Sequence, residues 1–323
     1  MTGDPAEPAT ITVIGEALID LVPGGPPGTF RALPGGSPYN VAIGLVRLGQ
    51  RAALMARLAD NTFGRLLRDK AAAEGIDLAA APRATEPTTL AVVNLDADAS
   101  ASYDFYFEGT ADWQWTGAEI AAVPASTAVL HFGSLASWTP PGDALILGLA
   151  GRLREGGRVL ISYDPNVRPS LLTDLVRARS QIEAAVTVAH LAKASGDDIA
   201  YLYPGRTAAE VAAHWLGLGA TLVVITGSAS GAEAFAASGA VVGRPARPVA
   251  VADTVGAGDS FTAGLLDSLV RQDLHDPAAL AAAQAGPLAG ALDDAIMVAS
   301  LNCQRQGNDP PTLAEVRSAF RPG

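Results

Sequence analysis

The chain has 323 residues, of which 49% are hydrophobic and 17% are charged, and its formal net charge is −11. This composition excludes a disordered or coiled-coil chain, because so many apolar residues can build a core. Lys and Arg are few and dispersed, so no basic track is available for a nucleic-acid backbone. We therefore expect a globular protein without a nucleic-acid partner.

The sequence also bears on where the protein acts. Cys303 is the only cysteine, which excludes an intramolecular disulfide and agrees with a reducing compartment. The first ten residues are acidic and Pro-rich and lack the pattern of a signal peptide. The Ala-rich stretch 280–299 contains Gly286, Pro287 and two aspartates, which would be costly in a membrane. We therefore expect a cytoplasmic protein without a membrane partner.

Short apolar runs alternate with longer helical patterns along most of the chain. The clearest strands are predicted at residues 11–14, 128–132, 159–163 and 222–226. Strands separated by helices build a parallel sheet, so the sequence predicts an α/β protein. Near the C-terminus, we interpret residues 273–290 as helix with a break at Gly286 and Pro287.

Two segments interrupt this alternation, at about residues 17–34 and 88–112. Both alternate apolar and polar residues and contain turn residues, which is typical of solvent-facing strands. Because they are inserted between elements of the α/β layer, we expect one small sheet that serves as a lid on a single domain spanning 1–323.

The strongest chemical signal is the segment 253–264, which reads DTVGAGDSFTAG. Gly256 and Gly258 let the backbone approach a ligand, and the N–H groups of a helix start can hold an anion such as phosphate. Asp259 beside such a turn can accept the proton of an attacking hydroxyl, as phosphoryl transfer requires. On spacing alone, the alternative that Asp259 only caps its helix is equally good.

The same segment resembles the C-terminal signature of the ribokinase, or PfkB, family of carbohydrate kinases. Residues 35–42, GGSPYNVA, followed by RLG at 47–49, resemble the N-terminal signature of that family. Three further segments are similar to bacterial fructokinases, namely GEALID at 15–20, DPNVRP at 164–169 and CQRQG at 303–307. The resemblance implies a ribokinase-like three-layer α/β/α fold and ATP-dependent phosphorylation of a sugar hydroxyl, foremost that of fructose to fructose 6-phosphate.

The resemblance also implies roles for individual residues. Asp259 matches the catalytic base, and the anion hole matches the backbone of Gly256, Ala257, Gly258 and Asp259. Sugar hydroxyls would contact Asp20, Gly35, Gly36 and Asn40, together with Asp259. The nucleotide would contact Asn166, Ser195, Thr226, Gly227, Gly231, Gly258 and Asn302.

Mg²⁺ and K⁺ are the cofactors that the resemblance implies beside ATP. The family often carries an N-x-x-E motif for magnesium, and the corresponding residues 195–198 here read SGDD. Asp198 then stands where glutamate is typical and would hold Mg²⁺ through water, with Asp197 as the alternative. Asp253 matches a carboxylate beside the K⁺ site of related kinases. Relatives commonly dimerise through the lid, so a homodimer is a further expectation.

The choice of sugar depends on the second lid segment. Residues 88–115 contain no Lys or Arg, whereas five are acidic: Asp96, Asp98, Asp104, Glu108 and Asp112. A lid of this charge should repel a sugar phosphate and favours an uncharged sugar. Its aromatic residues could stack on a sugar, but we interpret them as packing residues. Fructokinases commonly carry arginine where this chain has Phe107, which leaves the identity of the sugar open.

Several alternatives remain open within and outside this fold. A ribokinase, a 2-keto-3-deoxygluconate kinase or a nucleoside kinase would share the same motifs. A regulatory protein that binds sugar or nucleotide without turnover is the non-enzyme alternative, and the intact Asp259 and glycine turn oppose it. A Rossmann dehydrogenase and a P-loop kinase are excluded, since the chain lacks an early G-x-G-x-x-G and a G-x-x-x-x-G-K-[ST] motif.

Overall fold

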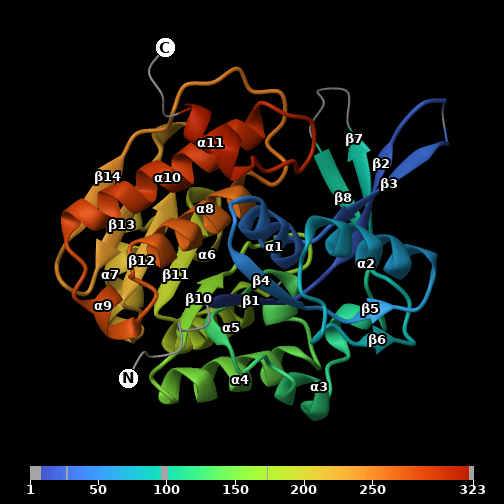
Figure 1. Ribbon diagram of the computed structural model, residues 1–323, viewed down its shortest axis with the longest axis horizontal. Helices are drawn as coiled ribbons and strands as arrows, with labels where there is room; N and C mark the ends of the chain where they lie inside the picture. Colours follow the sequence, from blue (N-terminus) through green and yellow to red (C-terminus); the bar gives the residue numbers. More distant parts are fainter. Residues whose placement is uncertain (1–8, 27, 96–100, 173, 320–323) are drawn as a thin grey trace, which may run out of the picture.

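The computed structural model describes residues 9–26, 28–95, 101–172 and 174–319 (Figure 1). Eight strands form the central sheet, in the order β14 (Val241–Arg244), β13 (Ala232–Ala236), β12 (Leu222–Thr226), β11 (Leu191–Ser195), β10 (Leu160–Asp164), β9 (Thr127–Gly133), β1 (Thr10–Ile14) and β4 (Arg51–Met55). Neighbouring strands are parallel from β4 to β12, and β13 and β14 continue the sheet antiparallel. The predicted mostly parallel sheet is confirmed.

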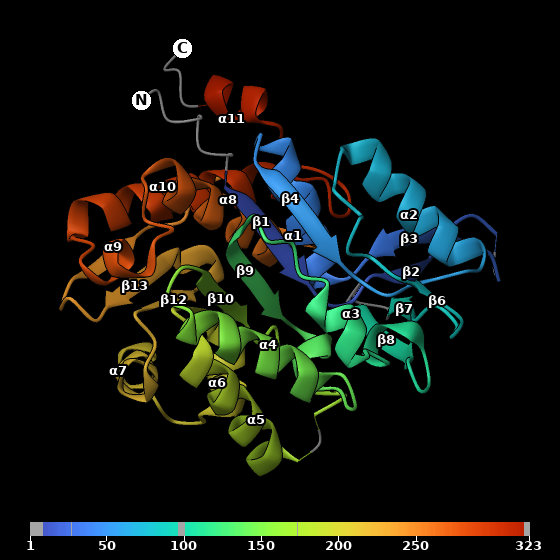
Figure 2. The same ribbon diagram turned by 60° about the horizontal axis from the view of Figure 1, so that its bottom comes forward.

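Helices cover both faces of this sheet, which gives three layers (Figure 2). One face packs against α1 (Ser37–Arg47), α8 (Ala257–Arg271) and α10 (Ala285–Cys303). The other packs against α4 (Asp143–Glu155), α5 (Leu175–Val188), α6 (Gly196–Leu202) and α7 (Ala208–Leu218). The remaining helices are α2 (Thr62–Glu74), α3 (Gly117–Ala121), α9 (Pro277–Ala281) and α11 (Leu313–Ala319).

The apolar runs that predicted the central strands serve both cores. In β12, Leu222 and Val224 belong to the core on one face, whereas Val223 and Ile225 belong to the core on the other. A strand buried on both sides needs apolar residues at every position, which is why such runs are continuous rather than alternating.

A small sheet stands beside the end of the central one (Figure 1). Its strand order is β3 (Phe30–Gly35), β2 (Leu18–Pro23), β7 (Leu90–Leu95) and β8 (Ala101–Tyr106). These strands coincide with the two predicted lid segments, except that β3 extends one residue beyond the first. Because β2 follows β1 after only a short link, the small sheet lies at the carboxyl ends of the parallel strands. A separate pair joins β5 (Leu58–Ala59) to β6 (Arg83–Ala84).

The predicted helix break near the C-terminus lies slightly earlier in the chain than expected. Helix α9 ends at Ala281 and α10 begins at Ala285, so the break is at residues 282–284. Gly286 and Pro287 lie instead in the first turn of α10. Proline is tolerated there because the first N–H groups of a helix have no partner within the helix.

Candidate active site

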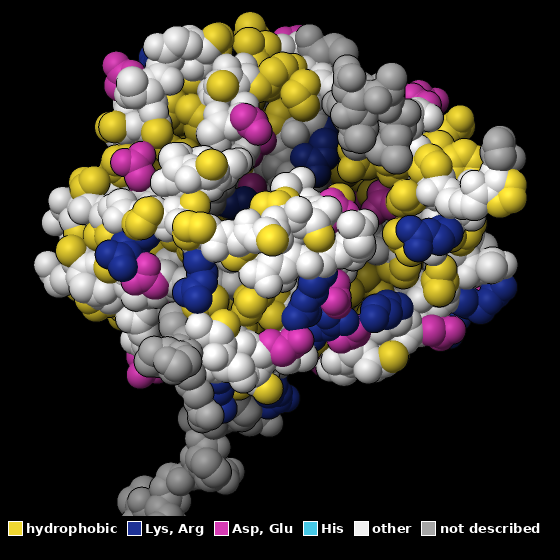
Figure 3. All heavy atoms as spheres, turned by 90° about the horizontal axis from the view of Figure 1, so that it is seen from above, with side chains coloured by type: hydrophobic (Ala, Val, Ile, Leu, Met, Phe, Trp, Pro, Cys, Tyr) yellow, Lys and Arg dark blue, Asp and Glu magenta, His cyan; other side chains and the backbone are white. Residues whose placement is uncertain are grey.

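Polar residues gather where the parallel strands of the central sheet end. Glu16 follows β1, Ser134 follows β9 and Asn166 follows β10. In open α/β sheets, this edge is where ligands bind. The surface is hollowed when seen from above, and both basic and acidic side chains lie in the hollow (Figure 3).

Two adjoining cavities open at this edge. The first has a volume of about 310 Å³ and a mainly polar lining, and we call it the polar cavity. The second has a volume of about 670 Å³ and a mainly apolar lining, and we call it the apolar cavity. Asn166, Thr254 and Gly258 line both cavities, so they form the rim where the two meet.

Asp259 lies in the polar cavity, in the first turn of α8. Its Oδ1 accepts a hydrogen bond from Ser37 Oγ at 2.6 Å, and its Oδ2 accepts one from Asn40 Nδ2 at 2.8 Å. Both donors come from the start of α1, so the two helix starts meet at this carboxylate. Burial raises the pKa of Asp259, and the two hydrogen bonds act against that rise.

The paired glycines bring the chain close to a second carboxylate. A Cβ at Gly35 would lie 2.1 Å from Oδ2 of Asp20. Gly36 has φ of 104°, and a Cβ there would lie 2.7 Å from the carbonyl oxygen of Glu16. Gly36 therefore has to be glycine, and a larger residue at position 35 would displace the Asp20 carboxylate. Asp20 lines the polar cavity, and burial raises its pKa to about 6, although the charge of Arg168 lowers it.

The turn before α8 has the features of an anion site. Gly256 caps the helix with φ of 74°, in the left-handed region. The N–H of Ala257 donates to Thr254 O at 3.2 Å, so this group closes the turn and is not free for a ligand as the sequence suggested. The N–H groups of Gly256, Gly258 and Asp259 have no acceptor within the described parts of the chain. Together with the helix dipole, they can hold a phosphate group.

Asn302 supports this turn from behind, which corrects the expectation that it contacts the nucleotide. Its side chain is fully buried; Nδ2 donates to Val255 O at 2.8 Å, and Oδ1 accepts from Asp309 N at 3.0 Å. Both ends of the amide are therefore used within the protein, and the residue fixes the loop that precedes Gly256.

The apolar cavity brings most of the other predicted nucleotide residues together. Ser195, Thr226 and Gly231 line it, as do the rim residues Asn166 and Gly258. Gly227 lies behind the lining, and its N–H donates to Gly231 O at 2.8 Å, which shapes the turn after β12. Apolar side chains, including those of Phe261 and Ile296, supply most of the remaining wall, as a flat aromatic base requires.

The two expected metal-site carboxylates are hydrogen-bonded to backbone N–H groups. Asp198 accepts from Ser195 N and from Val167 N, and it lines the apolar cavity, whereas Asp197 is exposed. Asp253 accepts from Val255 N and Gly307 N. No group of three or more metal-binding side chains occurs within the described ranges. Each carboxylate oxygen keeps a lone pair, so these residues fit a cation held mainly by water, carbonyl groups or a bound nucleotide.

The structure adds residues that sequence reasoning underrated. Tyr103 and Phe105 stack with ring centroids 5.9 Å apart and line the polar cavity, although the aromatic residues of the lid were expected only to pack. Their spacing by two placed them on one face of β8, which was the available signal. Arg168 and the fully buried Glu16 also line this cavity.

The acidic residues of the lid that the structure describes do not line the polar cavity. Asp112 is fully buried, accepting hydrogen bonds from Ala17 N and from Thr89 Oγ1. Asp104 and Glu108 are exposed, and Asp96 and Asp98 lie outside the described residues. Arg168 lines this cavity and its charge lowers the pKa of Asp20, so the cavity also contains a positive charge, and the expectation of an uncharged sugar stays a prediction.

Comparison with known proteins identifies the family. Residues 8–314 match the family described as pfkB family carbohydrate kinase. The chain belongs to the pfkB family of carbohydrate kinases. The resemblance seen in the signatures is thus confirmed, and with it the ribokinase-like α/β fold.

Several relatives of this sugar kinase are fructokinases. The fructokinase of Rhizobium leguminosarum bv. trifolii is 35% identical over 268 residues, which cover 82% of this chain and 81% of that protein. The fructokinase of Xylella fastidiosa, solved with bound ATP, matches with a TM-score of 0.87 and 27% identity, over 96% of this chain and 97% of that one. The fructokinase of Vibrio cholerae O395, in a fructose, ADP and calcium ion bound form, matches with a TM-score of 0.84 and 26% identity, over 97% and 99%.

Proposed function

We propose that this chain transfers the γ-phosphoryl group of ATP to a hydroxyl of fructose and releases ADP and fructose 6-phosphate. The observation that carries the proposal is the meeting of the two cavities at Gly258, directly beside Asp259. The polar cavity suits a sugar and the apolar cavity suits a nucleotide. The curated relative from Rhizobium leguminosarum is a fructokinase, and two solved structures of this architecture are fructokinases, one with bound ATP and one with fructose and ADP.

In the proposed reaction, Asp259 accepts the proton of the attacking hydroxyl. The sugar oxygen forms a bond to the γ-phosphorus, and the bond from that phosphorus to the β–γ bridging oxygen breaks, so the electron pair leaves with ADP. Ser37 and Asn40 hold the carboxylate in position through their hydrogen bonds. The free N–H groups of the α8 turn stabilise the phosphoryl oxygens.

Asp20 and Asn40 are proposed to fix the sugar. Oδ1 of Asn40 is buried without a hydrogen-bond partner among the described residues, and the side chain lines the polar cavity. A buried acceptor of this kind costs free energy until a ligand hydroxyl donates to it. Asp20, on β2 of the small sheet, supplies carboxylate oxygens to the same cavity.

Mg²⁺ is proposed as the ion that accompanies ATP, since it screens phosphate charge and keeps part of its hydration shell. Asp198 would orient its water, with Asp197 as the alternative. K⁺ is proposed to bind beside Asp253 and the turn carbonyls. Activity that is indifferent to replacing K⁺ with a large organic cation would exclude the second ion.

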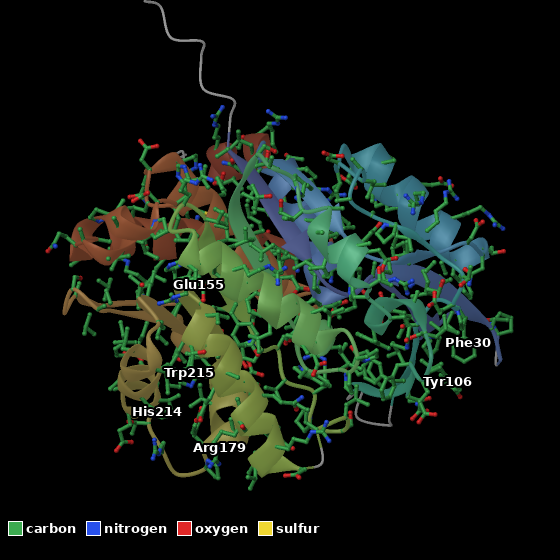
Figure 4. The ribbon with its side chains drawn as sticks, turned by 90° about the horizontal axis from the view of Figure 1, so that it is seen from below. Phe30, Tyr106, Glu155, Arg179, His214 and Trp215 are labelled. Atoms are coloured by element: carbon green, nitrogen blue, oxygen red, sulfur yellow. The ribbon has the colours of Figure 1, made fainter. Side chains whose placement is uncertain are left out.

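A homodimer through the small sheet is the proposed assembly. Phe30 and Leu33 on β3 and Tyr106 on β8 are exposed, and Figure 4 places Phe30 and Tyr106 at the same end of the molecule. Both strands are sheet edges, which a partner could cover. A monomeric mass in sedimentation experiments would rule this assembly out.

Within the described residues, no helix combines the length and the apolar character that a membrane span needs. The cytoplasm is the proposed compartment.

The test is ADP production by the purified protein with MgATP and a panel of acceptors. Fructose, ribose, glucose, 2-keto-3-deoxygluconate, nucleosides and fructose 6-phosphate cover the alternatives. Turnover should be fastest with fructose. A higher kcat/KM for ribose, a sugar acid or a nucleoside would move the assignment to that kinase, and ATP binding without turnover of any acceptor would favour the regulatory protein.

A further inference from the structure

Lys193 is a buried cation that the proposed reaction has not yet used. It lies on β11 with 4% of its surface exposed, and it lines the apolar cavity. Its Nζ lies 2.7 Å from Oδ2 of Asp164. A Cβ built on Gly258 would lie 3.4 Å from the same Nζ. The ammonium group is therefore next to the turn whose N–H groups face the rim.

The surroundings of Lys193 fix its position and keep it charged. Asp164 accepts from Asn166 N with Oδ1 and from Lys193 and Thr262 with Oδ2, so this carboxylate is held on several sides. Burial opposes the charge of Lys193, but nearby carboxylates, with Asp164 first, outweigh it and raise the pKa of the lysine.

The pair with Asp164 leaves hydrogen-bonding capacity unused. A lysine ammonium has three donors, and Asp164 is its one hydrogen-bond partner in the described chain. A buried ion pair is a weak source of stability, because desolvation offsets most of its attraction. A pair at the wall of a cavity, with donors to spare, is instead suited to an anion that enters the cavity.

We propose that Lys193 is a catalytic residue that contacts the transferred phosphoryl group and neutralises part of its charge in the transition state. This inference rests on the proposed kinase reaction. During transfer, the phosphoryl group passes the rim at Gly258, and its oxygens carry negative charge throughout. A fixed cation beside that path stabilises the transition state more than the bound ATP.

The experiment uses Lys193→Met, which keeps the length of the side chain and removes its charge. We expect kcat to fall about 10²- to 10³-fold, as for the loss of one charge-stabilising donor. Affinity for a non-hydrolysable ATP analogue, measured by calorimetry without sugar, should fall roughly tenfold to hundredfold. Affinity for ADP should stay close to wild type, since ADP lacks the group that Lys193 contacts.

Two matched variants separate this role from a structural one. Asp164→Asn removes the partner and keeps the ammonium, so it should retain the preference for the ATP analogue over ADP. Lys193→Met leaves the Asp164 carboxylate buried without its partner and could fail to fold for that reason. In that case the double variant Lys193→Met/Asp164→Asn, in which both groups are neutral, takes its place. Its kcat and affinities are then compared with those of Asp164→Asn.

The outcomes are distinguishable. Equal losses of ATP-analogue and ADP affinity, or an unchanged kcat, would overturn the role of Lys193 while the wild type remains an active kinase. A wild type that binds ATP but phosphorylates no acceptor would overturn the proposed function itself.

Discussion

The two cavities of this kinase differ in how they can hold a ligand. The polar cavity is small, about 310 Å³, and carboxylates, two amides and a guanidinium line it. The apolar cavity is about twice as large, 670 Å³, and presents mainly hydrocarbon. A ligand in the first is selected by the directions of its hydroxyl groups, whereas a ligand in the second is selected by its flat shape.

Backbone strain and buried ionisable groups occur at both cavities, since Ser228, with φ of 50°, and the buried Lys193 line the apolar one. Ser134 and Asn166, with φ of 51° and 40°, both line the polar cavity, and the fully buried Glu16 lies there as well. Left-handed residues other than glycine cost free energy and cluster at functional sites. The rim, which belongs to both cavities, is where we expect changes to affect chemistry rather than binding.

The largest effect is expected directly beside the rim, from Asp259→Asn. Loss of the general base should lower kcat about 10²- to 10⁴-fold. Affinities for sugar and nucleotide should each change by less than about tenfold, because the amide keeps the shape of the carboxylate. Steady-state rates and calorimetry measure these quantities. A loss that appears mainly in the affinity for sugar would mean that Asp259 binds the sugar and is not the base.

The buried acid of the polar cavity should make stability fall as pH rises. Burial raises the pKa of Glu16 from 4.5 to about 7, so between these values the folded state binds more protons than the unfolded state. This carboxyl group should therefore cost about 3 kcal/mol of unfolding free energy as pH rises from 4.5 to 8.

Glu16→Gln should remove that part of the pH dependence, as urea unfolding at several pH values will show. The control is Glu155→Gln, an exposed residue at the end of α4. Equal pH slopes in wild type and Glu16→Gln would show that Glu16 ionises in the folded state as it does in the unfolded state.

A smaller effect, confined to the polar cavity, is expected from Gly35→Ala. Its Cβ would lie 2.1 Å from Oδ2 of Asp20 and push that carboxylate away. The KM for sugar should rise about 10- to 100-fold, as for a lost hydrogen bond to a charged group, with the KM for ATP unchanged. Gly117→Ala is the control, since a Cβ there meets nothing within 4 Å. A matching rise in both KM values would mean that the cavities do not act separately.

The smallest effect is expected in the apolar cavity, from Gly231→Ala. The new Cβ would lie 2.0 Å from Arg244 O, and φ at this position is 94°. The shifted turn should raise the KM for ATP by about tenfold and leave that for sugar near wild type, since strain of this kind costs about 1–3 kcal/mol. Gly239→Ala, with φ of 87° but open space around it, isolates the backbone strain. If both variants behave alike, the turn at Gly231 has no part in nucleotide binding.

The sequence predicted the turn beside the rim of the site better than it predicted the residues that line the two cavities. Asp259 and its glycines are adjacent in the chain, so their local pattern was enough to predict the turn. The sheet and its layers followed from strands whose continuous apolar runs reflect burial on both faces. The four strands of the small sheet likewise fall in the two segments that alternate.

What the sequence could not supply depends on which side chains meet after folding. Asn302 and Asp112 have side chains of the types that bind ligands, yet both make hydrogen bonds to backbone groups of the protein itself. Ser37 meets Asp259 across 222 positions of sequence. In the sequence, Lys193 is only a lysine two residues before the SGDD segment that replaces the N-x-x-E motif. Its ion pair with Asp164 forms because β10 and β11 are parallel neighbours in the sheet.

The measurement that tests the account most directly is the stereochemical course at phosphorus. ATP with a chiral, isotopically labelled γ-phosphoryl group would be incubated with the protein and the sugar it turns over fastest. Direct transfer across the rim, with Asp259 taking only the proton, predicts inversion of configuration. Retention would mean two successive transfers through a phosphorylated enzyme group, and would contradict the role of Asp259 as base in a complex that holds both substrates together.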